Sequence, residues 1–157
     1  YVFENKPLGT GGGLLLASKN LDEPFLLLNG DTFFEVGLDD LYSFHNNNNS
    51  KWTISLFRSN ELERYMGVQL AKSGEVISLK SKEFFFDLLV NGGVYLIDPY
   101  VIDKLNLKLG IKTSLEDQLL PSFLSLGGRL FGKEYSGKFI DIGIPADYSR
   151  AHKILSE

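Results

Sequence analysis

Short apolar runs alternate with stretches of helical periodicity along this chain, and the alternation argues against all-helical and all-strand folds. The runs that predict strands are YVFE (1–4), PFLLL (24–28), KWTISLFR (51–58), GVQLA (67–71), VISLK (76–80), GVYLID (93–98) and KFIDIG (138–143). Helical spacing relates Leu38, Leu41, Tyr42 and His45; Leu115, Leu119 and Phe123; and, after Pro145 at a first-turn position, Tyr148, Ala151, His152 and Leu155. This order predicts a three-layer α/β domain.

The segment KSGE (72–75) supplies a tight turn between two of the predicted strands. We therefore expect GVQLA and VISLK to form a hairpin, an antiparallel excursion within the sheet. The length of 157 residues fits a single domain over 1–157, since such a chain can bury a sizeable core.

Charge and residue usage exclude several classes of partner. The net charge of -4 and the pI near 5.2, without a cluster of Lys and Arg, argue against nucleic acid and anionic membranes. The chain has no cysteine, hence no disulfide and no thiolate nucleophile. No apolar segment reaches the roughly 18 to 20 residues of a spanning helix, and the N-terminus has no signal-peptide pattern, so a cytoplasmic protein acting on small molecules is the expectation.

Two aspartates follow apolar strand runs directly. Asp31 follows PFLLLNG, whose short leucine-rich run fits a parallel strand covered on both faces, and Asp141 follows KFI. Strands of α/β sheets open at their carboxyl ends into ligand crevices, so both carboxylates are expected at one edge of the sheet. Such a pair suits Mg²⁺, which also binds substrate phosphates. The alternative is a pair of aspartates that merely cap loops.

The segment PLGTGGGL, from Pro7 to Leu14, lies between a strand pattern and a helix pattern. Glycines there allow backbone to approach a flat or anionic ligand at a helix start. As a dinucleotide fingerprint the segment is weak, because Leu14 stands where the third glycine belongs. A tight turn that caps a helix is the structural alternative.

Three further positions carry polar candidates, each with a structural alternative. Lys82 could meet a phosphate or be a solvated lysine. Asn91 and Gly93 could meet a polyol or form a bulge. Glu116 could bind a ligand or be a first-turn acid after an N-cap at Ser114.

Taken in order, several motifs resemble those of the sugar-1-phosphate nucleotidyltransferases, particularly the heptose and mannose 1-phosphate guanylyltransferases. The motifs are ENKPLGTGGGL, FLLLNGDTFFEV, ERYMGV, SLKSK, VNGGVYLID, SLEDQLLP and FIDIGIPADY. The resemblance implies a Rossmann-like fold with a mixed, mostly parallel sheet. It also implies attack of a sugar 1-phosphate oxygen on the α-phosphorus of an NTP, with GTP the expected nucleotide, giving an NDP-sugar and pyrophosphate for glycan or lipopolysaccharide precursors.

The resemblance also implies roles for individual residues. Asp31 and Asp141 match the aspartates that bind Mg²⁺, and Lys82 matches the lysine that holds the sugar phosphate. The remaining matches are Glu4, Leu8, Gly9 and Gly11 on the segment that lines the base, and Tyr65, Asn91, Gly93 and Glu116 on the sugar side.

The sequence departs from the family in three places. Lys80 and Ser81 stand where a glutamate usually precedes the lysine, and Met66 stands where glycine is usual. Nothing resembles the N-terminal GGxGTR loop that grips the triphosphate. The chain is therefore expected to correspond to the C-terminal two thirds or so of the family domain, to be inactive by itself, and to leave apolar faces through which a homo-oligomer could form.

Two other functions stay open from the sequence. One is a noncatalytic subunit that binds a nucleotide sugar or has a regulatory role. The other is a metal-dependent glycosyltransferase, which is disfavoured because NGDTFF holds a single acid where an Asp-x-Asp motif is expected.

Overall fold

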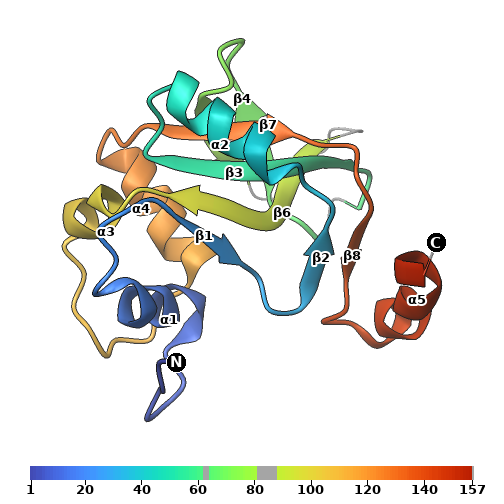
Figure 1. Cartoon of the computed structure of the whole chain (residues 1–157), viewed down its shortest axis with the longest axis horizontal. Helices are drawn as coiled ribbons and strands as arrows, with labels where there is room; N and C mark the ends of the chain where they lie inside the picture. The colour runs from blue at the N-terminus through green and yellow to red at the C-terminus, as the bar shows by residue number, and fades with distance from the viewer. Residues whose placement is uncertain (62–63, 81–87, 157) are drawn as a thin grey trace.

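The computed structural model of the chain describes residues 1–61, 64–80 and 88–156. Runs of two or more consecutive strands are separated by helices along this length (Figure 1). In chain order they are α1 (Gly9–Ser18), β1 (Phe25–Leu28), β2 (Thr32–Phe34), α2 (Leu38–Asn47), β3 (Trp52–Ser59), β4 (Gly67–Leu70), β5 (Val76–Lys80), β6 (Leu88–Ile97), α3 (Tyr100–Leu105), the π-helix η1 (Leu115–Leu119), α4 (Leu120–Ser125), β7 (Leu130–Glu134), β8 (Phe139–Asp141) and α5 (Pro145–Ser156).

The main sheet is mixed and is organised around β6. One edge of β6 pairs antiparallel with β3, from Trp52↔Ile97 to Ser59↔Leu88. Its other edge pairs with β1 near Ile97 and with β4 at Val90, both antiparallel. β7 extends the sheet parallel to β3, and β5 extends it antiparallel to β4, which confirms the predicted hairpin. Four strands thus run in one direction, and β5 and β6 run in the other. The sheet is mixed as expected, but β3 with β7 is the only parallel pair among its described strands, so the pairing is mostly antiparallel rather than mostly parallel.

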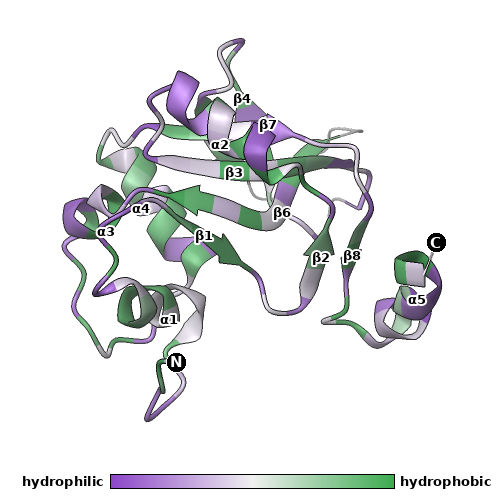
Figure 2. Ribbon diagram, viewed as in Figure 1, coloured by the Kyte–Doolittle hydropathy of each residue, from purple (hydrophilic) through white to green (hydrophobic). Residues whose placement is uncertain are grey.

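Alternation along the strands separates two cores. Trp52, Ile54 and Leu56 of β3 and Tyr95 and Ile97 of β6 lie in a large core with residues of α1, α3, η1 and α4. The residues of β6 that alternate with these, Val94 and Leu96, lie in a smaller core with residues of α2 and β2. Successive side chains of a strand point to opposite faces, so these strands supply the middle of three layers. Figure 2 shows that α2 is mainly hydrophilic, as a short covering helix should be.

The strand β1 differs from the expectation of a strand covered on both faces. Phe25 and Leu27 pack against the large core, but Leu26 and Leu28 are 43% and 60% exposed. Within the described residues β1 pairs with β6 alone, so it lies at an edge of the sheet. A run of leucines therefore predicted the strand correctly and its burial wrongly.

Other sequence predictions are also corrected. YVFE (1–4) forms no strand and is exposed, whereas β2, β7 and α3 form without having been predicted. Pro145 does begin α5, and Ser114 does cap η1 by accepting a hydrogen bond from the Asp117 amide. No helix among the described residues has the length and apolar character needed to cross a membrane.

A buried polar chain joins α2 to the sheet at His45. His45, 3% exposed, lies 2.8 Å through Nδ1 from the hydroxyl of Thr53. Thr53 donates to Ser50, and Ser50 donates to the carbonyl of Trp52. The single hydroxyl hydrogen of Thr53 is thereby used, so Nδ1 of neutral His45 must be the donor. Burial lowers the pKa of His45, and the charge of Lys51 lowers it further against the opposing effect of Asp98.

We predict that stability falls with acidification because of this histidine. In the unfolded chain His45 binds a proton at about pH 6.5, whereas in the folded chain it does so only at lower pH. The contribution of neutral His45 to the free energy of unfolding is therefore complete above about pH 6.5 and is lost as the pH falls below it. Urea unfolding between about pH 7.5 and 5.5 should show that the free energy of unfolding falls, and His45 can account for at most about 1.4 kcal/mol of this fall per pH unit. The variant His45→Gln should lose this component of the slope.

The matched control is His152→Gln, because His152 is exposed on α5. This variant should keep the wild-type pH dependence. An unchanged slope in His45→Gln would show that other groups cause the acid sensitivity.

Candidate active site

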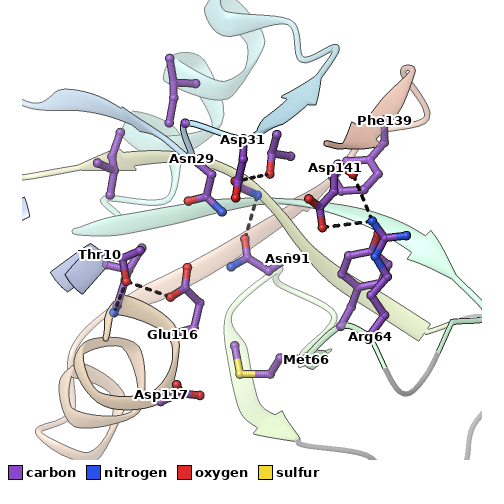
Figure 3. Close-up of a pocket in the computed structure, with 17 residues that line it drawn as sticks. Thr10, Asn29, Asp31, Arg64, Met66, Asn91, Glu116, Asp117, Phe139 and Asp141 are labelled. Carbon is purple, nitrogen blue, oxygen red and sulfur yellow. Dashed lines mark hydrogen bonds and ion pairs between the residues drawn. The ribbon is translucent and has the colours of Figure 1, made fainter. Parts of the chain in front are cut away.

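A pocket of about 720 Å³ opens beside the end of β1 and the middle of β6 (Figure 3). Its walls come from segments far apart in the sequence, namely α1, the β1–β2 turn, the segment 64–66, β6, η1 and β8. The lining residues are Thr10, Leu27, Leu28, Asn29, Gly30, Asp31, Thr32, Arg64, Tyr65, Met66, Asn91, Gly93, Leu115, Glu116, Asp117, Phe139 and Asp141.

The structure brings Asp31 and Asp141 together. β2 and β8 pair antiparallel with Thr32 opposite Asp141, and the amide of Ile142 donates to the carbonyl of Asp31 at 2.8 Å. A Cβ placed on Gly143 would lie 3.1 Å from Oδ2 of Asp31 and 3.0 Å from Oδ1 of Asp141. These two oxygens are therefore no more than about 6 Å apart. Two ligands of one cation with metal–oxygen distances near 2.1 Å need a separation of about 4 Å or less, which this upper limit allows.

The described lining is strongly acidic. Four carboxylates, those of Asp31, Glu116, Asp117 and Asp141, face a single guanidinium, that of Arg64. No group of three or more potential metal-ligating side chains occurs within the described residues, so a cation between Asp31 and Asp141 would take its other ligands from water and substrate. This donor set is typical of Mg²⁺, which keeps several waters and binds phosphates through few carboxylates.

Another wall of the pocket carries the predicted sugar-side residues on β6 and η1. Asn91 donates through Nδ2 to the hydroxyl of Tyr95 at 2.7 Å, and that hydroxyl donates to Oε1 of Glu116 at 3.4 Å. Thr10 of α1 donates to the other oxygen of Glu116 at 3.2 Å. Burial raises the pKa of Tyr95, and the charge of Glu116 raises it further, so the hydroxyl stays protonated as a donor.

Gly93 sits in this wall with φ of +75°, a conformation that L side chains rarely adopt. A Cβ there would also lie 3.0 Å from Nδ2 of Asn29. Its amide donates to Oδ1 of Asn91 at 3.0 Å, which fixes that side chain. The structure thus brings Asn91, Gly93 and Glu116 together on one wall.

Tyr65 lines the pocket near the two aspartates. Its ring packs edge to face on Phe57 and Phe139, with centroids 5.4 and 5.8 Å away. Burial raises the pKa of Tyr65 to about 12. The neighbouring Met66 also lines the pocket.

The glycine-rich segment has a packing role that differs from the expected ligand-facing loop. The amides of Gly11 and Gly12 donate to the carbonyl of Thr113, and a Cβ on Gly9 would lie 2.7 Å from the same oxygen. Glu4 accepts from the amide of Leu8 at 2.9 Å. Of this segment Thr10 lines the pocket, whereas Glu4, Leu8, Gly9 and Gly11 do not, and their assignment to the base stays a prediction.

Lys82 lies outside the described residues, so its predicted role stays untested. The sequence analysis missed Thr10, Arg64, Tyr95 and Phe139 as site residues. Tyr95 was hidden within an apolar strand run, and Arg64 within a loop whose path depends on the tertiary structure. A signal was available for Arg64 alone, because it directly precedes Tyr65.

Comparison with known proteins assigns the family. The nucleotidyl transferase family matches residues 1–157, and the chain belongs to this family. It is 35% identical over 156 residues to the D-glycero-alpha-D-manno-heptose 1-phosphate guanylyltransferase of Aneurinibacillus thermoaerophilus, covering 99% of this chain. It is 33% identical over 150 residues to the mannose-1-phosphate guanylyltransferase catalytic subunit beta of Xenopus tropicalis, covering 92% of this chain.

A solved structure shows the same fold. HddC from Yersinia pseudotuberculosis, complexed with GMP-PN, is 29% identical and superposes over 97% of this chain with a TM-score of 0.79. The chain spans 66% of the Aneurinibacillus protein, 41% of the Xenopus protein and 64% of the HddC chain. These relatives confirm the predicted family and its nucleotidyltransferase fold.

We predict that Tyr95→Phe destabilises the fold by about 1–3 kcal/mol, because it removes the shared partner of Asn91 and Glu116 in a buried setting. Urea unfolding at neutral pH measures the effect. Tyr148→Phe is the control, because Tyr148 is 68% exposed, and its effect should stay within about 0.5 kcal/mol. Equal midpoints for the two variants would contradict the role given to the Tyr95 hydroxyl.

Proposed function

We propose that the protein transfers a nucleotidyl group, GMP from GTP, to a sugar 1-phosphate. The observation that carries this proposal is the convergence of Asp31 and Asp141 in a pocket that is also lined by Asn91 and Glu116. Residues 1–157 act in this proposal as one nucleotidyltransferase domain, and similarity to the two guanylyltransferases supports the choice of guanine.

The reaction demands alignment more than covalent work from the protein. An oxygen of the sugar 1-phosphate attacks the α-phosphorus of GTP, a new P–O bond forms, and the bond from that phosphorus to the α,β-bridging oxygen breaks. Pyrophosphate leaves with the electron pair of the broken bond, so the atoms balance without an enzyme-bound intermediate. Holding the reactants in line is worth several kcal/mol of the barrier.

The residues of this chain divide the work between two ends of the pocket. Asp31 and Asp141 would hold a divalent cation, which when bound neutralises phosphate charge and orients the phosphate oxygens. The amide of Asn91 and the carboxylate of Glu116 can hydrogen-bond sugar hydroxyls, and the Tyr95 hydroxyl fixes both side chains. A manno-configured heptose or hexose 1-phosphate is the first choice of sugar, following the relatives.

The acidic lining supports a need for added positive charge. Two substrates that carry phosphates would meet four carboxylates and one guanidinium among the described lining residues. The negative charges of the phosphates and of these carboxylates repel each other. A cation at the aspartates, together with Lys82 near the sugar phosphate, would reverse this balance.

We predict that the protein expressed from its complete gene releases pyrophosphate from GTP, Mg²⁺ and a manno-configured sugar 1-phosphate. The variant Asp31→Asn should lower turnover by about 10²-fold or more, because it removes one of two carboxylates for the cation. Asp39→Asn on the exposed start of α2 is the control and should keep wild-type turnover.

Three results would count against this reading. A preference for dTTP or UTP over GTP would overturn the base assignment. Nucleotide-sugar binding without pyrophosphate release would favour a noncatalytic subunit, and transfer of sugar from a nucleotide sugar would favour a glycosyltransferase. The same assay on the 157-residue chain alone tests the expectation that it is inactive.

We predict further that Lys82→Ala lowers turnover with sugar 1-phosphate by roughly 10²-fold or more. An aligned charge in a site of low water content is worth about 2.7–4 kcal/mol, by analogy with removal of one oxyanion donor. Lys72→Ala, in the exposed β4–β5 turn, should leave the kinetics unchanged. Equal kinetics for both lysine variants would show that Lys82 is a surface lysine.

A further inference from the structure

Arg64 connects the candidate cation site to helix α5. Its Nη2 lies 3.1 Å from Oδ2 of Asp141 and 2.5 Å from Oδ2 of Asp147, near the start of α5. Nη2 also donates to the main-chain carbonyl of Asp141 at 3.3 Å, and Nη1 pairs with Glu61 at 3.2 Å. Figure 3 shows the guanidinium directed at Asp141 from the edge of the pocket.

The setting keeps this guanidinium charged and in place. The side chain is 19% exposed, and its guanidinium carbon lies 4.9 Å from the centre of the Tyr65 ring. Burial acts to lower the pKa of Arg64, but hydrogen bonds to Asp147 and Asp141 outweigh it and raise the pKa above its usual value. The planar fork of a guanidinium, with donors at fixed angles, can orient carboxylates in a way that a point charge cannot.

Asp141 is held at both of its carboxylate oxygens. Oδ2 accepts from Arg64, while Oδ1 accepts from the amide of Gly143 at 2.9 Å. A Cβ on Gly143 would lie 3.0 Å from this Oδ1 and 3.1 Å from Oδ2 of Asp31, so both oxygens border the same space beside Gly143. Fixing Oδ2 of Asp141 therefore fixes the direction of Oδ1 in the space that it shares with Asp31.

We propose that Arg64 is a positioning residue for the cation site, because it orients Asp141 so that one oxygen faces Asp31. This inference rests on the proposed function, which places a divalent cation between the two aspartates. Arg64 touches neither substrate nor cation in this role and acts through Asp141. Partners that orient a metal-binding carboxylate typically change metal affinity by 10–100-fold when they are removed.

A purely electrostatic role predicts the opposite sign. A guanidinium close to a cation repels it, so loss of the positive charge alone would tighten cation binding. If Arg64 mainly occupied Asp141 in competition with the cation, its removal would likewise tighten binding. The direction of the change therefore separates orientation of Asp141 from simple charge effects.

The test measures Mn²⁺ binding by the EPR signal of free Mn²⁺, with no nucleotide and no turnover. Arg64→Gln should weaken binding about 10-fold or more. Arg64→Lys keeps the charge but loses the fork, so it should weaken binding by a smaller factor. Arg150→Gln is the matched control. Arg150 pairs with the other oxygen of Asp147 at 2.6 Å and is 60% exposed. Among the ion pairs of the described residues, none joins Arg150 to Asp141.

Arg150→Gln should bind Mn²⁺ as the wild type does or slightly more tightly, and thermal unfolding of each variant checks that it is folded. Affinity in Arg64→Gln or Arg64→Lys equal to or tighter than wild type would overturn the positioning role. If Arg64→Gln does not fold, Arg64→Lys decides alone. The variant Asp31→Asn separates the two proposals. If the wild type binds Mn²⁺ no more tightly than Asp31→Asn, the proposed cation site is wrong. If binding depends on Asp31 but is the same in the Arg64 variants, only the positioning role is wrong.

Discussion

The hydrogen bonding of β6 to three other strands determines the arrangement of the whole domain. β6 pairs with β3 along one edge and with β1 and β4 in succession along the other. The residues of the sugar-side wall, Asn91 and Gly93, lie near the point where its partner changes from β4 to β1. The place where β1 stops pairing is also where the chain turns into Asn29 and Asp31, so the pocket forms where the second edge of β6 passes between partners.

The same strand links stability to chemistry. Tyr95 belongs to the large core, yet its hydroxyl bonds to Asn91 and Glu116, which line the pocket. Removing a buried hydroxyl that has two partners destabilises a fold, because both partners then lose a hydrogen bond where water cannot readily replace it. A change in this core residue should therefore alter the sugar-side wall even without direct contact to substrate.

Local patterns predicted those features that depend on local chemistry. The hairpin of β4 and β5, the start of α5 at Pro145 and the cap at Ser114 follow from turn and cap chemistry within a few residues. The exposure of Leu26 and Leu28 was not predictable, because it depends on which elements cover β1. The packing role of Gly9 and Gly11 depends likewise on Thr113, about a hundred residues later in the chain. Convergence of Asp31 and Asp141 was expected from strand ends, but Arg64 required the tertiary structure.

The pairing that joins the two aspartates is too short to stand alone. β2 and β8 have three residues each, and an isolated two-stranded ladder is marginal in water even when longer. Aromatic packing supplies what the ladder lacks: Phe139 stacks on Phe57 with centroids 3.8 Å apart and meets Phe34 edge to face at 5.6 Å. Phe34 and Phe139 belong to the two paired strands, and Phe57 to β3 of the main sheet. The spacing of the two carboxylates thus depends on an aromatic cluster that anchors a small sheet to a large one.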